Sequence, residues 1–92
     1  MKTKYFATFG QAHGFRNKVV CILAPSRTHA HSAMHEIFGK NWAFLYEFHD
    51  PQDGYTAQAA EFRYEIMACV EVCVDQHTKR MYLEPINEDQ FV

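Results

Sequence analysis

One amphipathic helix with defined ends constrains the fold of this chain more than any other feature of its sequence. Apolar residues recur at the three- and four-residue spacing of a single buried helical stripe, at Ala30, Ala33, Met34, Ile37 and Phe38. Pro25 precedes the stripe as a start signal, with Ser26 or Thr28 as the N-cap. Gly39 follows the stripe directly, where a residue in the left-handed conformation would end a helix. We therefore expect a helix over residues 26–38 whose apolar stripe packs against a second layer.

Strands supply that second layer. Segments that are rich in β-branched and aromatic residues, or that alternate between two faces, lie at residues 3–9, 18–24, 42–49, 62–75 and 80–83. The second of these is a continuous apolar run, which is typical of a strand buried on both faces. A short helical turn is expected near residues 56–60, where alanines and glutamines gather. Residues 75–79 are expected to turn the chain between the last two strands.

Alternation along a strand also predicts which residues share a face. In the first strand, Tyr5 shares a face with Phe9, opposite Phe6. In the long strand, strict alternation places Ile66 on the same face as Ala68 and opposite Met67. We expect the larger apolar residues of these faces to form the core.

The chain has room for one hydrophobic core. Its 92 residues are too few for two, so residues 1–92 form a single α+β domain. We expect an antiparallel sheet of four to five strands with one main helix on one face, in the order β-β-α-β-(short helix)-β-β. The buried residues should include Met34, Ile37, Phe38, Phe44 and Val72.

A near-neutral charge narrows the classes of function. The net charge is −2 with both signs interspersed, whereas non-specific nucleic-acid binders usually carry a marked basic excess. The sequence contains no apolar stretch of membrane-spanning length and no apolar core of a signal peptide near its N-terminus. Three cysteines, an odd number, suit a reducing compartment better than a disulfide framework. We expect a cytoplasmic protein.

Two histidines on the expected helix raise the question of a metal site. His31 and His35 are four residues apart and share one helical face, a spacing that can bind zinc. A zinc site needs at least a third protein ligand. Cys69 and Cys73 share a strand face, but this spacing separates them by about 13 Å. We therefore expect no metal and no other cofactor, and interpret the histidines as solvated flanks of an amphipathic helix.

Catalytic motifs are missing from the sequence. It contains no nucleophile elbow, phosphate-binding loop, dinucleotide-binding glycine pattern or paired carboxylates. Ser26 is explained by its place at a helix N-cap, and Cys21 by its place in an apolar strand. We expect a protein that is not an enzyme and takes no small-molecule substrate, with a zinc-dependent enzyme as a distant alternative.

Two surfaces offer alternatives for binding. Arg16 and Lys18 lie beside His13 in the first hairpin, where they would suit contacts to phosphate. Aromatic residues alternate along one strand, at Trp42, Phe44, Tyr46 and Phe48. This stripe would suit base stacking, but its neighbours are acidic rather than basic, so core packing against the helix is favoured.

The first half of the chain contains the runs KYFATFG, NKVVCILAPS and FGKNWAFLY, with Ala33-Met34 between the last two, and in these runs it resembles a recurrent group of small phage-encoded accessory proteins. Members of that group begin with a Phe-Thr-Phe-Gly-like strand and continue with an apolar strand that ends in Ala. A helix closing on Phe-Gly, a Trp and a Tyr then follow. The matching positions here are Phe6 to Gly10, Val19 to Ala24, Ala33-Met34, Phe38-Gly39, Trp42 and Tyr46, within residues 4–46.

This resemblance implies a phage protein with no catalytic residues to carry over. Phage-encoded single domains of this size and charge also look like anti-CRISPR proteins, and the implied function is stoichiometric inhibition of the type I (Cascade) surveillance complex in the host cytoplasm. The partner would be its Cas proteins, with a possible contact to guide RNA. Strand interiors are committed to the core, so we expect partner contacts from loop and tail residues: His13, Arg16, Asp50, Asp53, Tyr55, Glu88 and Asp89. The alternative is a small phage nucleic-acid-binding protein that uses the Arg16 and Lys18 hairpin.

Overall fold

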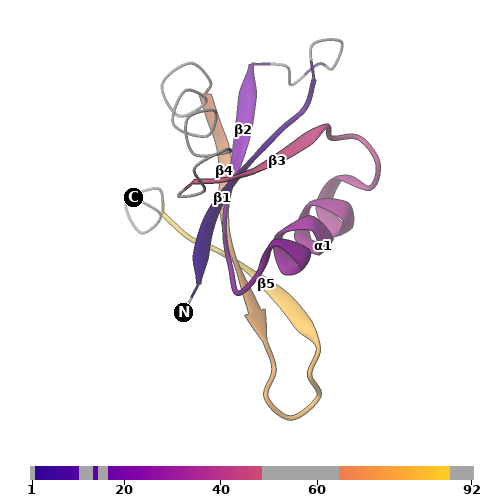
Figure 1. The fold of residues 1–92 in the computed structure, drawn as a ribbon, viewed down its shortest axis with the longest axis vertical. Helices are drawn as coiled ribbons and strands as arrows, with labels where there is room; N and C mark the ends of the chain where they lie inside the picture. The colour runs from indigo at the N-terminus through magenta and orange to yellow at the C-terminus, as the bar shows by residue number, and fades with distance from the viewer. Residues whose placement is uncertain (1, 11–13, 15–16, 49–64, 88–92) are drawn as a thin grey trace.

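Strands and one helix follow each other in the order β-β-α-β-β-β along the described part of the chain (Figure 1). The computed structural model describes residues 2–10, 14, 17–48 and 65–87. Its elements are β1 (Thr3–Thr8), β2 (Lys18–Ala24), α1 (Arg27–Phe38), β3 (Phe44–Glu47), β4 (Glu65–Val74) and β5 (Met81–Pro85). This confirms the α+β class and the order of these elements. The helical turn expected near residues 56–60 lies outside the described residues.

The sheet is mixed, and its centre differs from the prediction. The five strands lie in the order β3-β1-β2-β4-β5. Neighbours are antiparallel except β2 and β4, which run parallel, with Lys18 beside Glu65 and Leu23 beside Glu71. The expectation of an antiparallel sheet is therefore wrong at this pair. The physical reason is the connection, because the chain leaves β2 through α1 and β3 and returns as a crossover rather than a hairpin.

Helix α1 begins and ends where its sequence signals predict. The hydroxyl of Ser26 accepts a hydrogen bond from the backbone N–H of His29 at 3.2 Å, so Ser26 is the N-cap. Gly39 has a φ of 62° and its N–H donates to the carbonyl of His35 at 2.8 Å, which closes the helix. In the described part of the chain, no helix is long and apolar enough to cross a membrane.

Two clusters of buried side chains lie on opposite faces of the sheet. The cluster on the α1 face contains Tyr5, Ala7, Phe9, Val20, Ile22, Ala24, Ala30, Ala33, Met34 and Val72. The cluster on the other face contains Phe6, Val19, Cys21 and Cys69. Strand β2 contributes to both, which confirms the strand buried on two faces. The alternation predicted for β1 is confirmed as well.

One β-bulge changes the predicted faces of β4. Its pairing with β2 shifts between Val19 and Val20, which lie beside Ile66 and Ala68. Met67 is the extra residue, and such an insertion moves the residues before it to the opposite face. Ile66 accordingly packs with the cluster around Phe6, whereas Ala68, which was predicted on the same face as Ile66, packs together with Met67 on the α1 face. The strict alternation predicted through this part of the strand is wrong.

Two residues expected in the core are exposed. Ile37 is 43% exposed and Phe44 is 57% exposed. The last turn of α1 packs against the sheet through Phe38, whose ring lies edge-on to that of Phe9 with centroids 5.0 Å apart. On β3, Leu45 faces the α1 side, so the aromatic residues of that strand point away from the helix. Phe38 is half-buried, and Met34 and Val72 are fully buried as predicted.

Both edge strands of the sheet are partly closed to further strand pairing. On β3, the guanidinium of Arg27 donates to the carbonyl of Leu45 at 3.3 and 3.4 Å. On β5, the N–H of Ile86 donates to the carbonyl of Cys69, so the neighbouring Pro85 lies on the unpaired side. Proline has no N–H to offer there. Both devices make a strand edge a poorer template for another chain.

The hairpin between β4 and β5 supports a prediction about pH. The carboxylate of Asp75 accepts hydrogen bonds from the backbone N–H groups of His77 at 2.7 Å and Thr78 at 3.0 Å. The hydrogen bond from Thr78, followed by that from His77, lowers the pKa of Asp75 below its ordinary value of 3.8. A lowered pKa stabilises the folded state above the unfolded pKa, and this stabilisation is lost as the pH falls through the folded pKa.

We therefore expect Asp75→Ala to lower the melting temperature at neutral pH. The difference from the parent protein should disappear at a pH below the folded-state pKa of Asp75. Thermal melts from pH 7 down to strongly acidic pH would measure it, with exposed Glu36→Ala as the control. A difference that stays constant across this range would show that Asp75 acts through something other than its charged carboxylate.

Candidate functional site

The loop and tail residues predicted to contact a partner lie outside the described residues: His13, Arg16, Asp50, Asp53, Tyr55, Glu88 and Asp89. Their roles stay predictions. Of the basic hairpin, Lys18 is described, and its ammonium pairs with the carboxylate of Glu65 at 3.1 Å across the β2–β4 ladder. This pair neutralises one of the two charges on which the nucleic-acid alternative depends.

The histidines of α1 face outward from the helix. His31 lies edge-on against the ring of Trp42, with ring centroids 5.0 Å apart. Together with neighbouring residues of α1 and with Met81, His31 and His35 line an open hollow of about 540 Å³. In the described part of the chain, these histidines belong to no group of three donor atoms close enough to hold a metal ion.

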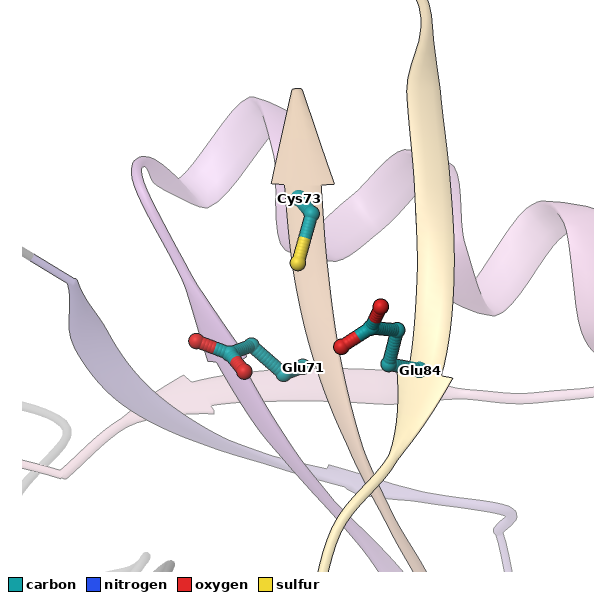
Figure 2. A group of neighbouring side chains, drawn as sticks. All are labelled: Glu71, Cys73 and Glu84. Atoms are coloured by element: carbon teal, nitrogen blue, oxygen red, sulfur yellow. The ribbon is translucent and has the colours of Figure 1, made fainter. Parts of the chain in front are cut away.

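A different cluster brings such donors together on the face of the sheet that is turned away from α1. Glu71 and Cys73 alternate on β4 with the buried Val72, and Glu84 lies directly beside Glu71 on β5. Figure 2 shows the three side chains gathered on one side of these two strands. Their donor atoms, two carboxylate oxygens and one thiol sulfur, all lie within 4.8 Å of one another.

A lysine from the start of the chain completes the cluster. The ammonium of Lys2 lies 2.6 Å from a carboxylate oxygen of Glu71 and 3.6 Å from the sulfur of Cys73. The hydrogen bond to Glu71 raises the pKa of Lys2 above its ordinary value, against a smaller opposing effect of burial. On β5, the electrostatic interaction with Cys73 raises the pKa of the Tyr82 hydroxyl, and a hydrogen bond between the two side chains adds to this effect. The cluster therefore attracts positive charge and disfavours further negative charge.

The cluster was not predicted, although the sequence contained a signal for it. The pairing of Cys73 was considered only along its own strand, with Cys69. The turn at residues 75–79 was predicted, and a hairpin around it sets Glu84 opposite Glu71. The register across the hairpin places the three residues together, and the spacing of residues along one strand does not show this.

The chain was compared with protein-family models, with curated proteins and with solved structures. No match was found. The resemblance to phage-encoded accessory proteins therefore rests on the matching residues within 4–46, most of which the structure places in the core. Phe6, Val19 to Cys21, Ala33 and Met34 are buried, so these motif residues specify the fold rather than a site.

An aromatic surface lies at the opposite edge of the sheet from the cluster. Phe44 is 57% exposed on the edge strand β3. Its ring stacks on that of Tyr46, with centroids 6.1 Å apart and an interplanar angle of 30°. Further along, the ammonium of Lys4 lies 5.9 Å from the centre of the Phe48 ring, which itself packs edge-on against Phe6. We call Phe44, Tyr46, Phe48 and Lys4 the β3 surface.

Proposed function

We propose that this chain is a phage-encoded protein that inhibits a type I CRISPR surveillance complex by binding to it in the host cytoplasm. Binding is stoichiometric and blocks the complex from engaging target DNA. The protein acts as a ligand of the Cas proteins and catalyses no reaction. The resemblance over residues 4–46 supports the phage origin, and the choice of target rests on the size and near-neutral charge that the chain shares with phage-encoded anti-CRISPR proteins.

The exposed ring of Phe44 is the observation that best supports a protein partner. A large apolar side chain held in water costs free energy that burial in a complex recovers. The stacked contact with Tyr46 restricts the Phe44 side chain before a partner binds, which reduces the conformational entropy lost on binding. Aromatic residues that are held in place in this way commonly dominate the free energy of protein interfaces.

Charge argues for protein rather than nucleic acid as the partner. Lys18 pairs with Glu65, and the chain as a whole carries a net charge of −2. Binding to a phosphate backbone relies on several unpaired cations and on counterion release. The loop residues predicted at Asp50 and Asp53 would instead complement a basic surface, such as one that a nucleic-acid-binding complex presents.

The proposal is tested by titrating the protein into a purified type I complex and measuring retention of labelled target DNA in a gel shift. A stoichiometric inhibitor reaches its end point at about one equivalent per binding site, whereas an enzyme acts far below that amount. Phe44→Ala should weaken inhibition by roughly tenfold or more, as expected for an aromatic residue central to an interface. Charge reversal at both Asp50 and Asp53 should also weaken it while leaving the circular dichroism spectrum unchanged.

The matched control is Ile37→Ala, which removes another exposed apolar side chain, from α1 rather than from the β3 surface. It should leave inhibition unchanged. The opposite result would be tight binding to naked DNA or RNA at physiological salt, lost in the double variant Arg16→Glu, Lys18→Glu, with no association to the complex. That outcome would establish the nucleic-acid alternative and refute inhibition by protein binding.

A further inference from the structure

We propose that Glu71, Cys73 and Glu84 form a binding site for a thiophilic divalent metal ion such as zinc. This departs from the expectation of no metal that was drawn from His31 and His35, because the donors come from another part of the fold. The site is independent of the proposed inhibitor function. It follows from the register of one hairpin.

The geometry of the donors suits one ion. Zinc takes thiolate sulfur at about 2.3 Å and carboxylate oxygen at about 2.0–2.2 Å, so the donors of a tetrahedral site lie roughly 3.3–3.8 Å apart. The three donor atoms here lie within 4.8 Å of one another. Glu84 is exposed, so rotation of its side chain can bring its carboxylate toward the other two donors. Three protein ligands leave a fourth position open for water, as in zinc sites that are not closed by the protein.

The electrostatics of the cluster favour a cation. Glu71 and Glu84 are cross-strand neighbours on one face, an arrangement in which like charges repel. The ammonium of Lys2 contacts Glu71 and Cys73. The carboxylate of Glu84 forms no hydrogen bond or ion pair with the described residues. One ammonium therefore compensates two carboxylates incompletely, and a divalent ion would compensate both.

The donor set selects the kind of metal. Thiolate is a soft ligand that favours zinc and similar ions over magnesium and calcium, which prefer oxygen alone. Binding converts the Cys73 thiol into a metal-bound thiolate and releases one proton to solvent, with no change of oxidation state. Lys2 has to move aside, so its ammonium and the metal ion compete for the same two residues.

Cobalt(II) chloride is the direct probe, since a cobalt–thiolate bond gives a charge-transfer band in the near ultraviolet that carboxylates do not give. Titration of the reduced full-length protein should produce this band with a stoichiometry of about one ion per chain, and zinc chloride should remove it. Cys73→Ser should abolish the band. Glu84→Gln should weaken cobalt binding by roughly tenfold or more.

Two further variants test whether cobalt binding depends on this cluster rather than on exposed carboxylates in general. Glu65→Gln changes an exposed carboxylate on the same strand, outside the cluster, and should leave cobalt binding unchanged. Lys2→Met removes the competing ammonium and should tighten binding. The proposal is overturned if excess cobalt gives no charge-transfer band, or if the band persists in Cys73→Ser. A band that Glu84→Gln leaves unaltered, in a variant with a parent-like circular dichroism spectrum, would also overturn it.

Discussion

Replacing Phe6 with alanine is expected to destabilise the protein by about 3–5 kcal/mol, the usual cost of removing a fully buried phenylalanine ring. Phe6 is 0% exposed and packs with Val19, Cys21 and Cys69 on the face of the sheet away from α1. Its ring also meets that of Phe48 edge-on at 5.7 Å. The total free energy of unfolding of a small domain is only about 5–15 kcal/mol, so Phe6→Ala should remove a large share of it.

Urea unfolding followed by circular dichroism would measure this loss. The chain contains its own control, since Phe44→Ala makes the same chemical change at a ring that is 57% exposed. That variant should change the free energy of unfolding by no more than about 0.5 kcal/mol. Equal losses in the two variants would mean that the cluster around Phe6 does not hold the second face of the sheet.

The second large effect is expected at the contact between helix and sheet. Met34 is 0% exposed and lies among the buried residues of α1, β1 and β2. Met34→Ala should cost about 2–5 kcal/mol, depending on how far the neighbouring side chains close the cavity. Because α1 contributes only Ala30, Ala33 and Met34 to the buried set, Met34 is its one large buried side chain.

Ile37→Ala provides the comparison on the same helix. Ile37 is 43% exposed, and alanine has the higher helix propensity, so this change should be close to neutral. Thermal melts of the two variants should differ by many degrees. If Ile37→Ala were the more damaging change, the rotation of α1 about its axis would have to differ from the one described.

Local signals predicted most of the fold. The helix was recognisable because Ser26 and Gly39 act on the backbone within one turn of each helix end, and neither depends on distant residues. Strand β2 was predicted at its observed bounds, Lys18–Ala24, because an apolar run that is buried on both faces differs in composition from its surroundings. Both of these features are properties of a few neighbouring residues.

Features that depend on distant pairing were not predictable in the same way. The parallel alignment of β2 with β4 depends on how the chain crosses the sheet, and no residue in either strand encodes a direction. The bulge at Met67 is set by the pairing with Val19 and Val20, since its own strand alternates without interruption. Phe44 reads as a core residue because its strand is aromatic, but the sheet turns that face away from α1.

The cluster of Glu71, Cys73 and Glu84 lies between these two cases. Its register follows from a hairpin whose turn is local and was predicted. The pairing of the two glutamates could therefore be predicted from the sequence. The contribution of Lys2 was not, because it comes from a residue 69 positions earlier in the chain. The hairpin part of this cluster can therefore be predicted from the sequence, whereas the contact made by Lys2 cannot.

The parallel ladder at the centre of the sheet has a consequence for how the molecule assembles. On one side of it lie β3, β1 and β2, all from residues 3–47, and on the other side lies the β4–β5 hairpin, from residues 65–85. Each half forms its remaining ladders within itself, so each can begin to organise before the two meet. The join between the two halves pairs residues 47 positions apart, so it carries a larger entropic cost of loop closure than the β4–β5 hairpin does. The same boundary separates the first three strands in the sequence from the hairpin that carries Glu71, Cys73 and Glu84.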